Sequence, residues 1–255
     1  MSGGIGLALR QVHYENRAFW RNPAAAFFTF VFPLMFMVIF NVLFGGLGRG
    51  SSSASQFYTP TLIVFSVITA TFTNIAMSVT MARDEGVLKR VRGTPLPAWA
   101  FLAGRVLHAI LIAALLVMII SAFGAILYQV RFPWERLPAV VATLAVGAAT
   151  FSSLGLALTG VIPNGDAAPA VVNATILPLE FISNIFIDMR QAPGWLNSVS
   201  EIFPVRHFAD AMLALWNPTT AGSGFAPGDL LVIAGWGVAG LLLALRFFSW
   251  EPRIS

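Results

Sequence analysis

The sequence contains no cysteine, and only 10% of its 255 residues are charged, against roughly 25% in an ordinary soluble domain. The absence of cysteine excludes disulfide frameworks, thiolate zinc sites, iron–sulfur clusters and thiol nucleophiles. The shortage of charge excludes an ordinary cytosolic enzyme and a disordered chain. Apolar residues make up 57% of the sequence, and the mean hydropathy is +0.80. They form long uncharged runs, which are typical of a polytopic membrane protein.

Motifs for catalysis and nucleotide binding are also missing. The sequence has no G-x-x-x-x-G-K-[ST] run, so it cannot bind phosphate in the manner of a P-loop. Its three histidines, His13, His108 and His207, fall in segments that we do not expect to converge on one site. Ser152-Ser153-Leu154-Gly155 lacks the leading glycine of a nucleophile elbow. We therefore expect no catalytic residue, no metal site and no bound cofactor in this chain, and an intramembrane enzyme is disfavoured.

Six long apolar runs predict six transmembrane helices, since a helix needs about 20 residues to cross the hydrocarbon core. We place these spans at residues 23–44, 59–82, 101–129, 137–162, 167–187 and 229–248. The sixth reaches membrane length only if Arg246 extends its charged end towards the interface. The expected fold is an all-α polytopic membrane protein, with one six-span domain over residues 1–255.

The basic residues predict the orientation of the chain in its membrane. With the N-terminus inside, ten of the 15 basic residues fall on the cytoplasmic side. These ten are Arg10, Arg17, Arg21, Arg83, Lys89, Arg90, Arg92, Arg105, Arg246 and Arg253. The other five are Arg49, Arg131, Arg136, Arg190 and Arg206. Because short cytoplasmic loops carry the excess of Lys and Arg, both termini should be cytoplasmic, and the net charge of +4 does not indicate nucleic-acid binding.

Residues 1–22 lack the apolar core of a cleavable signal peptide. Ile5, Leu9, Val12 and Phe19 instead recur near helical spacing, among the charged residues Arg10, Glu15 and Arg17. Such a pattern predicts an amphipathic helix that lies in the membrane interface. An irregular leader is the alternative, and in either case Asn22-Pro23 marks the break before the first span.

The loop at residues 83–97 has an ordered distribution of charge. Asp84 and Glu85 come first and Lys89, Arg90 and Arg92 come last, which suits the dipole of a short helix. Gly93, Pro95 and Pro97 would end that helix, and Val87, Leu88 and Val91 would give it an apolar face. A charged, capped helix of this kind is suited to docking on another protein. The alternative is a solvated loop whose basic residues only enforce orientation.

This loop resembles the signature of type-2 ATP-binding cassette (ABC) exporter permeases, in which an acidic pair, glycine, an apolar pair and a basic patch precede Thr-Pro. Two further segments are similar to that family. They are Arg21-Asn22-Pro23 with the Phe-rich residues 26–40, and residues 193–211 with Pro193-Gly194-Trp195, Phe203-Pro204 and Phe208-Ala209-Asp210-Ala211. The resemblance covers essentially the whole chain, and exporters of the daunorubicin-resistance type are the most similar.

The resemblance implies a permease without ATPase activity of its own. A separate ATP-binding subunit, present in two copies and carrying ATP and Mg²⁺, would drive export of a hydrophobic or amphipathic compound by alternating access. A second permease, identical or related, would complete the path through the lipid bilayer. The implied ATPase-contacting residues are Arg83, Asp84, Glu85, Gly86, Val87, Leu88, Lys89, Arg90 and Arg92. A polysaccharide or glycolipid exporter of the same superfamily is the alternative.

Glu180 is the only charge deep within an expected span. If the helix continues through residue 188, Asn173, Glu180, Asn184 and Asp188 fall on one side of it. This stripe would line the substrate path or a gate, or it would form hydrogen bonds that clamp helices together. A stand-alone proton-coupled transporter that uses Glu180 is the rival hypothesis, although the sequence shows no internal repeat that would support it.

Residues 188–228 form the longest polar stretch and predict an outer re-entrant hairpin. Apolar residues follow helical spacing on both sides of Pro204, but each piece is too short to span. In the family that the chain resembles, this region forms an outer gate. Asn184 and Asp188-Met189-Arg190 depart from the usual pattern, which has Gly and Pro at those places.

Overall fold

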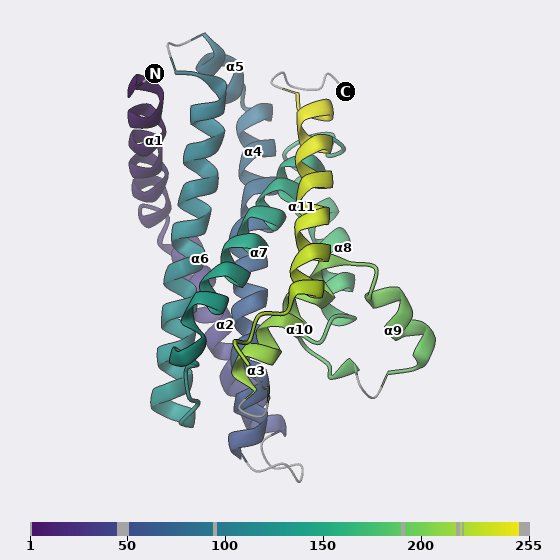
Figure 1. Ribbon diagram of the computed structural model, residues 1–255. Coiled ribbons are helices and arrows are strands. Elements are labelled where there is room, and N and C mark those ends of the chain that lie inside the picture. The colour runs from purple at the N-terminus through teal and green to yellow at the C-terminus, as the bar shows by residue number, and fades with distance from the viewer. Residues whose placement is uncertain are drawn as a thin grey trace.

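The computed structural model describes residues 2–44, 51–93, 96–189, 192–217, 220 and 222–249. Within this part of the chain all regular structure is helical (Figure 1). The helices are α1 (Ser2–Trp20), α2 (Pro23–Phe44), α3 (Ser51–Ile68), the π-helical turn η1 (Thr69–Thr73), α4 (Asn74–Asp84), α5 (Val87–Arg92), α6 (Ala98–Tyr128), the 3₁₀ turn η2 (Trp134–Arg136), α7 (Leu137–Leu158), α8 (Ala168–Phe181), α9 (Gly194–Ser200), α10 (Pro204–Trp216) and α11 (Pro227–Phe247).

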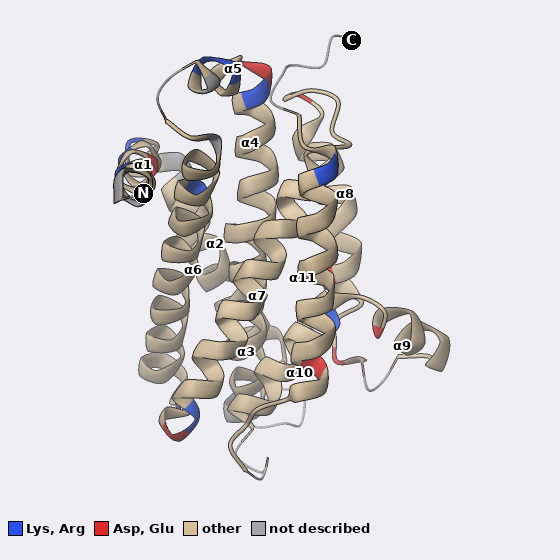
Figure 2. Ribbon diagram, turned by 45° about the horizontal axis from the view of Figure 1, so that its top comes forward, with Lys and Arg blue, Asp and Glu red and all other residues tan. Residues whose placement is uncertain are grey.

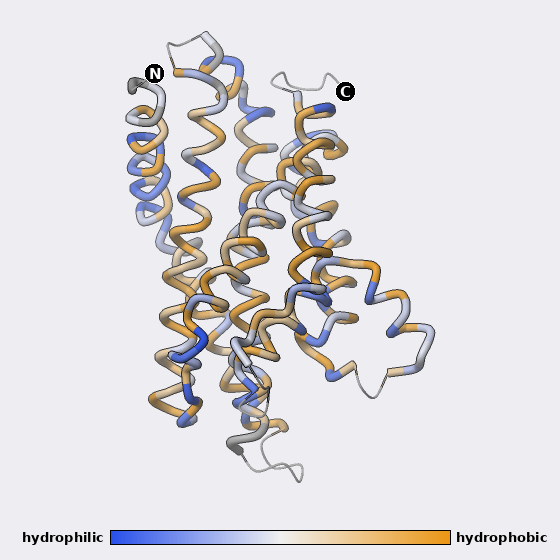
Figure 3. The backbone as a smooth tube through the Cα atoms, viewed as in Figure 1, coloured by the Kyte–Doolittle hydropathy of each residue, from blue (hydrophilic) through white to orange (hydrophobic). Residues whose placement is uncertain are grey.

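Five helices in the described part are long and apolar enough to cross a membrane. They are Ala26–Phe44, Ala54–Asp84, Trp99–Tyr128, Trp134–Leu158 and Pro227–Phe247. Hydrophobic residues follow these helices along most of their length, whereas α1 is largely hydrophilic (Figure 3). The protein is therefore an all-α, multi-pass integral membrane protein, as the sequence predicts. The helix Ala54–Asp84 is longer than the expected span, because α3, η1 and α4 follow one another without a break.

The expected fifth span differs from the structure. Helix α8 has 14 residues and ends at Phe181, six residues before the expected end at 187. At about 1.5 Å per residue, α8 alone is too short to cross the hydrocarbon core. Asn184 lies just beyond it with a φ of 60°, a left-handed conformation that stops helical continuation. The number of crossings therefore stays a prediction.

Charged residues gather near the two ends of the bundle, and the long helices between them carry few charges (Figure 2). Helix α5 and the end of α11 lie at one end, which we call the α5 end (Figure 1). The loops that lead into α7 and α11 lie towards the other end, the α10 end (Figure 1). This separation matches the pattern that the sequence predicts, but the side of the membrane that each end faces is a proposal.

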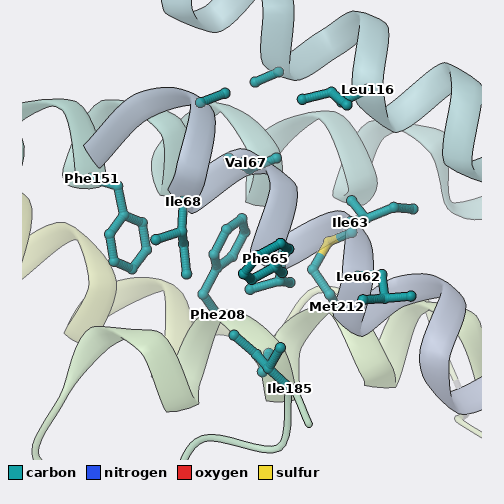
Figure 4. Packing of buried hydrophobic residues seen from close by; sticks show 14 of the residues in the cluster. Leu62, Ile63, Phe65, Val67, Ile68, Leu116, Phe151, Ile185, Phe208 and Met212 are labelled. Atoms are coloured by element: carbon teal, nitrogen blue, oxygen red, sulfur yellow. The ribbon is translucent and has the colours of Figure 1, made fainter. Parts of the chain in front are cut away.

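The helix formed by α3, η1 and α4 is the centre of the bundle. Leu62, Ile63 and Ile68 of α3 are fully buried, and Phe151 of α7 and Phe208 of α10 meet them (Figure 4). A second apolar cluster occupies the α5 end and consists of Ile75, Val79, Ala82, Leu88, Phe101 and Ala109. The two clusters hold α3–α4 between α6, α7 and α10.

Two glycines allow close approach of α7 to its neighbours. A Cβ on Gly155 would lie 2.7 Å from the Phe72 carbonyl oxygen in η1, and a Cβ on Gly147 would lie 2.5 Å from the ring of Phe208. Helix α11 packs on α7 in the same close manner, since its Gly237 faces Thr150. Small residues let helix backbones approach in a membrane, where apolar side chains gain little from leaving lipid.

Helix α1 packs against the first half of α6. The two helices lie side by side towards the α5 end of the bundle (Figure 1). Glu15 accepts a hydrogen bond of 3.0 Å from Arg105 Nε, and Gly104 faces Gln11. Leu9, expected on the same apolar face as Val12, is exposed. Among the described residues, the expected apolar face is therefore partly buried and partly exposed. The location of α1 in the membrane interface stays a prediction.

Candidate functional site

The expected docking helix is shorter than the loop that contains it. Helix α4 continues to Asp84, the chain turns at Glu85 and Gly86, and α5 covers only Val87–Arg92. Gly86 has a φ of 70°, which a residue without a side chain adopts at least cost. The acidic pair therefore lies at the end of α4, and the expectation that it begins the short helix is wrong. We call residues 85–93 the α5 arm.

The apolar face of α5 is used inside the protein. Leu88 is fully buried in the cluster at the α5 end, and Val87 and Val91 pack on the same cluster. Leu88 is therefore used for packing within the chain, and the prediction that the short helix docks on another protein stays a prediction. The surface available to a partner is polar and consists of Glu85, Lys89 and Arg90, which are all exposed. The Arg92 side chain, Thr94 and Pro95 lie outside the described residues.

Arg83 is not on that surface either, because its side chain is 1% exposed. Its guanidinium donates hydrogen bonds to three carbonyl oxygens beyond the end of α7: Thr159 at 2.8 Å, Ile162 at 2.7 Å and Pro163 at 3.5 Å. A positive charge is favourable at the C-terminal end of a helix, where carbonyl groups lack intrahelical partners. Arg83 therefore fastens the end of α4 to residues 159–167, the α7–α8 loop, and its side chain is buried within the chain rather than on the exposed surface of the α5 arm.

Asp84 contributes a second link to the same loop. Its Oδ2 accepts a hydrogen bond of 3.1 Å from the backbone N–H of Gly165. Gly165 also packs closely on Met81 of α4, and Asn164 caps the N–H of Ala167 at 2.9 Å. The consecutive residues Arg83 and Asp84 thus hold the segment that leads directly into α8.

The structure separates the four polar residues that were expected to form one stripe on the fifth helix. Asn173 is exposed, whereas Glu180 is 1% exposed. Asn184 and Asp188 follow the end of α8, so the expectation that they continue its face is wrong. No described side chain forms a hydrogen bond or ion pair with the Glu180 carboxyl group. The geometry therefore does not support an interhelical clamp through Glu180.

Asn184 instead belongs to a polar network towards the α10 end. It donates a hydrogen bond to Asp210 Oδ1, and its side-chain oxygen accepts one from the Met189 N–H at 2.6 Å. Arg206 Nε binds the other oxygen of Asp210 at 2.6 Å. This network joins the segment after α8 to α10. The Arg206–Asp210 pairing confirms the contact that their spacing of four residues predicts.

His207 joins α10 to α11. Its Nδ1 is 2.7 Å from Asp229 Oδ1 and its Nε2 is 2.8 Å from the Glu201 carbonyl oxygen. Both partners only accept hydrogen bonds, so a doubly protonated ring alone can donate to both. Burial lowers the pKa of His207, but the hydrogen bonds to Asp229 and Glu201 and the charges of Asp229 and Asp210 outweigh it, so the pKa lies above its usual range.

Two features of the α10 end were not identified from the sequence. The His207–Asp229 pair links residues 22 positions apart, and Arg136 binds the carbonyl oxygens of Ala214, Leu215 and Asn217 at 3.2, 3.0 and 2.9 Å. Arg136 thereby donates hydrogen bonds to carbonyl groups at the end of α10, where intrahelical donors are lacking. Neither pairing has a local sequence signal, because each depends on where α10 folds back.

Two apolar cavities lie beside α8. One, of about 360 Å³, lies between α2 and α8 and is lined by Phe32, Phe36, Phe40, Phe44, Phe65, Leu177, Phe181, Phe186 and Ile187. The other, of about 440 Å³, lies between α7, α8 and α11 and includes Phe72, Leu154, Ile176, Phe203, Trp236 and Phe247. Both are suited to apolar rather than strongly polar molecules.

The fold and this arrangement define a multi-pass membrane protein whose α5 arm is fastened to its bundle. Residues 11–216 match the family described as ABC-2 type transporter, and the chain belongs to that family. It is 28% identical over 253 residues to the daunorubicin resistance ABC transporter permease protein DrrB1 of Streptomyces coeruleorubidus, covering 98% of this chain and 87% of the relative.

Two further relatives are similar to this chain. The putative transport permease YvfS of Bacillus subtilis is 23% identical over 221 residues, covering 86% of this chain and 88% of the relative. The probable multidrug ABC transporter permease YbhR of Escherichia coli is 25% identical over 154 residues, covering 60% of this chain and 42% of the relative. The chain is thus a permease-family membrane protein.

Proposed function

We propose that the chain is the permease subunit of an ATP-driven exporter in a bacterial plasma membrane, with both termini in the cytoplasm. Two copies of a separate ATP-binding subunit, which hold ATP and Mg²⁺, would supply the energy. A second permease, identical or related, would complete the transport path. Family membership supports transport, and the lack of a P-loop in the sequence supports a separate ATPase.

The observation that carries this proposal is the polar surface of the α5 arm. Glu85, Lys89 and Arg90 are exposed at one end of the bundle, while Leu88 anchors the arm to α4 and α6. Arg90 also donates to the Glu85 carbonyl oxygen at 3.1 Å, which steadies the turn between α4 and α5. A charged surface on an anchored arm can bind a partner and pass its movement into the bundle.

The proposed substrate is hydrophobic or amphipathic. The cavity between α2 and α8 supports this choice, because aromatic rings form most of its wall and no charged side chain lines it. Phe186 contacts Phe36 and Phe65 there, with ring centroids 6.0 and 5.5 Å apart. A glycan would need more hydrogen-bonding groups than this wall offers. Exposed apolar residues of α2 and α8 also offer a surface for a second permease.

The proposal is tested by purifying the chain with its ATP-binding subunit. We expect the amount of ATP-binding subunit that co-purifies with the chain to fall at least about tenfold in the double variant Lys89→Glu and Arg90→Glu. The two acidic side chains would replace the basic ones that are proposed to complement the surface of that subunit. The variant Arg246→Glu reverses an exposed charge near the same end and is the matched control. Equal recovery of the ATPase with both variants would contradict the proposed docking surface.

A further inference from the structure

The α7–α8 loop is fastened to the last two residues of α4, immediately before the α5 arm begins. Arg83 holds the carbonyl oxygens of Thr159 and Ile162, and Asp84 holds the N–H of Gly165. The first two acceptors follow α7, and Gly165 lies three residues before α8 begins at Ala168. Both links therefore act on the short connection between α7 and α8.

The link has little freedom. Arg83 is 1% exposed, and its two principal hydrogen bonds are 2.8 and 2.7 Å long. A buried guanidinium is costly to leave without acceptors, so α4 and the loop should move together rather than separate. Helix α4 also packs directly on α7 and α8.

Helix α8 is held at its other end as well. Asn184, just beyond α8, donates to Asp210 of α10 and accepts from the Met189 N–H. Between these two attachments α8 contributes Leu177 and Phe181 to the aromatic cavity and carries the buried Glu180. A displacement at the Arg83 end would thus reach the cavity through one helix of 14 residues.

We propose that Arg83 and Asp84 are positioning residues that transmit movement of the α5 arm to α8 through the α7–α8 loop. This inference rests on the proposed function, in which an ATPase moves the arm. It adds a role to the one expected for the two residues: they connect the docking surface of the ATPase to the wall of the cavity. Loss of the link should leave ATP hydrolysis in place and uncouple it from transport.

The absence of native cysteine allows the two movements to be measured separately by spin labelling. Gly93→Cys on the arm and Ala174→Cys on α8 are each paired with Leu111→Cys on α6, and all three positions are exposed. Distances are recorded for the full chain with its ATP-binding subunit in nanodiscs, with and without MgATP and vanadate. In the parent chain we expect both distances to change.

The variants Arg83→Met and Asp84→Ala, alone and together, should keep the change at the arm and lose the change at α8. Transport should fall at least about fivefold, in the range of a typical coupling between sites, while ATP hydrolysis stays within about twofold. Asp84→Asn should behave as the parent, because its side-chain oxygen still accepts from Gly165. Arg246→Met, an exposed arginine near the same end, is the matched control.

An equal shift of α8 in the double variant would overturn this inference and leave the proposed function intact. No nucleotide response at either position in the parent chain would overturn the proposed function and this inference with it. If Arg83→Met does not fold, Asp84→Ala gives the same test, because the Asp84 side chain is exposed and supplies one link alone.

Discussion

Glu180 has an ionisable side chain in an enclosed, largely apolar place. It is 1% exposed, on a helix whose other buried residues are Ala168, Val172 and Ile176. An ionised carboxylate at the centre of a bilayer costs about 2.5–3.5 kcal/mol on insertion scales, so an ionisable residue in such a place is a candidate functional residue. No described side chain pairs with its carboxyl group, so the described contacts give no support to a stabilising role.

Replacement of Glu180 by glutamine separates a functional role from a clamp. We expect Glu180→Gln to leave the thermal unfolding temperature of the purified chain unchanged or higher, because no hydrogen-bonded partner is lost. An altered range of transported compounds, with assembly unchanged, would indicate a functional role for the carboxyl group. Asn173→Ala, on the exposed side of the same helix, is the control. A clear drop in unfolding temperature or loss of assembly would support the clamp instead.

His207 makes the stability of the α10 end depend on pH. Its pKa is raised in the folded protein, so its contacts with Asp229 and Glu201 contribute fully below the unfolded pKa of about 6.5. That contribution is lost as the pH rises through the higher, folded pKa. Asp210 also acts on the ring, and Arg206 neutralises part of its charge.

The expected result is a difference in unfolding temperature between the parent chain and His207→Gln that is largest at pH 5–6 and shrinks towards pH 9. The variant His13→Gln removes an exposed histidine on α1 and should show no such trend. A difference that stays constant over this range, or that grows with pH, would contradict the assignment of a protonated ring.

At the scale of elements, the contact between α7 and η1 depends on the absence of a side chain at Gly155. An alanine Cβ there would lie 2.7 Å from the Phe72 carbonyl oxygen, and a backbone atom cannot move aside as a side chain can. The turn η1 has π-helical geometry, which often marks a functional place in a helix. The two elements are therefore closely matched in shape.

We expect Gly155→Ala to destabilise the protein by about 1–3 kcal/mol, the usual cost of overpacking. In Gly235→Ala the added Cβ meets nothing within 4 Å, so the same substitution on α11 should be neutral or slightly stabilising. Thermal unfolding in detergent, followed by tryptophan fluorescence, compares the two. Equal stability of both variants would show that α7 and η1 are not in close contact.

Sequence reasoning was most successful where a pattern is local. Long uncharged runs predicted the all-α membrane fold, and the start of α7 at Leu137 falls where the fourth span was expected. Predictions were wrong where contacts between distant segments determine which way a side chain points or where a helix ends. Nothing local shows that Leu88 faces α4 and α6, that Arg83 binds the carbonyl groups after α7, or that Asn184 turns out of α8 to reach Asp210.

The short helix α10 shows the same limit. Its spacing predicted a helix after Pro204, and the structure has one from Pro204 to Trp216. Trp216 and Phe208 are buried in the central core, however, and Gly147 of α7 makes room for the Phe208 ring. A sequence shows that such a helix is amphipathic, but it does not show which helices receive its apolar side.

In the proposed function the whole molecule is a membrane bundle that a partner moves. In this proposal the α5 arm is the docking surface, and Arg83 and Asp84 connect the arm to α8, which forms part of an aromatic cavity. Each part has a role only if energy enters through the α5 end. A stand-alone transporter would need none of these connections.

The most direct measurement is transport of a hydrophobic dye into inverted liposomes that contain the purified chain, with and without its ATP-binding subunit. The account predicts uptake only when that subunit and MgATP are both present, and substrate-stimulated ATP hydrolysis that requires the permease. Uptake at the same rate by the chain alone, without nucleotide, would contradict it.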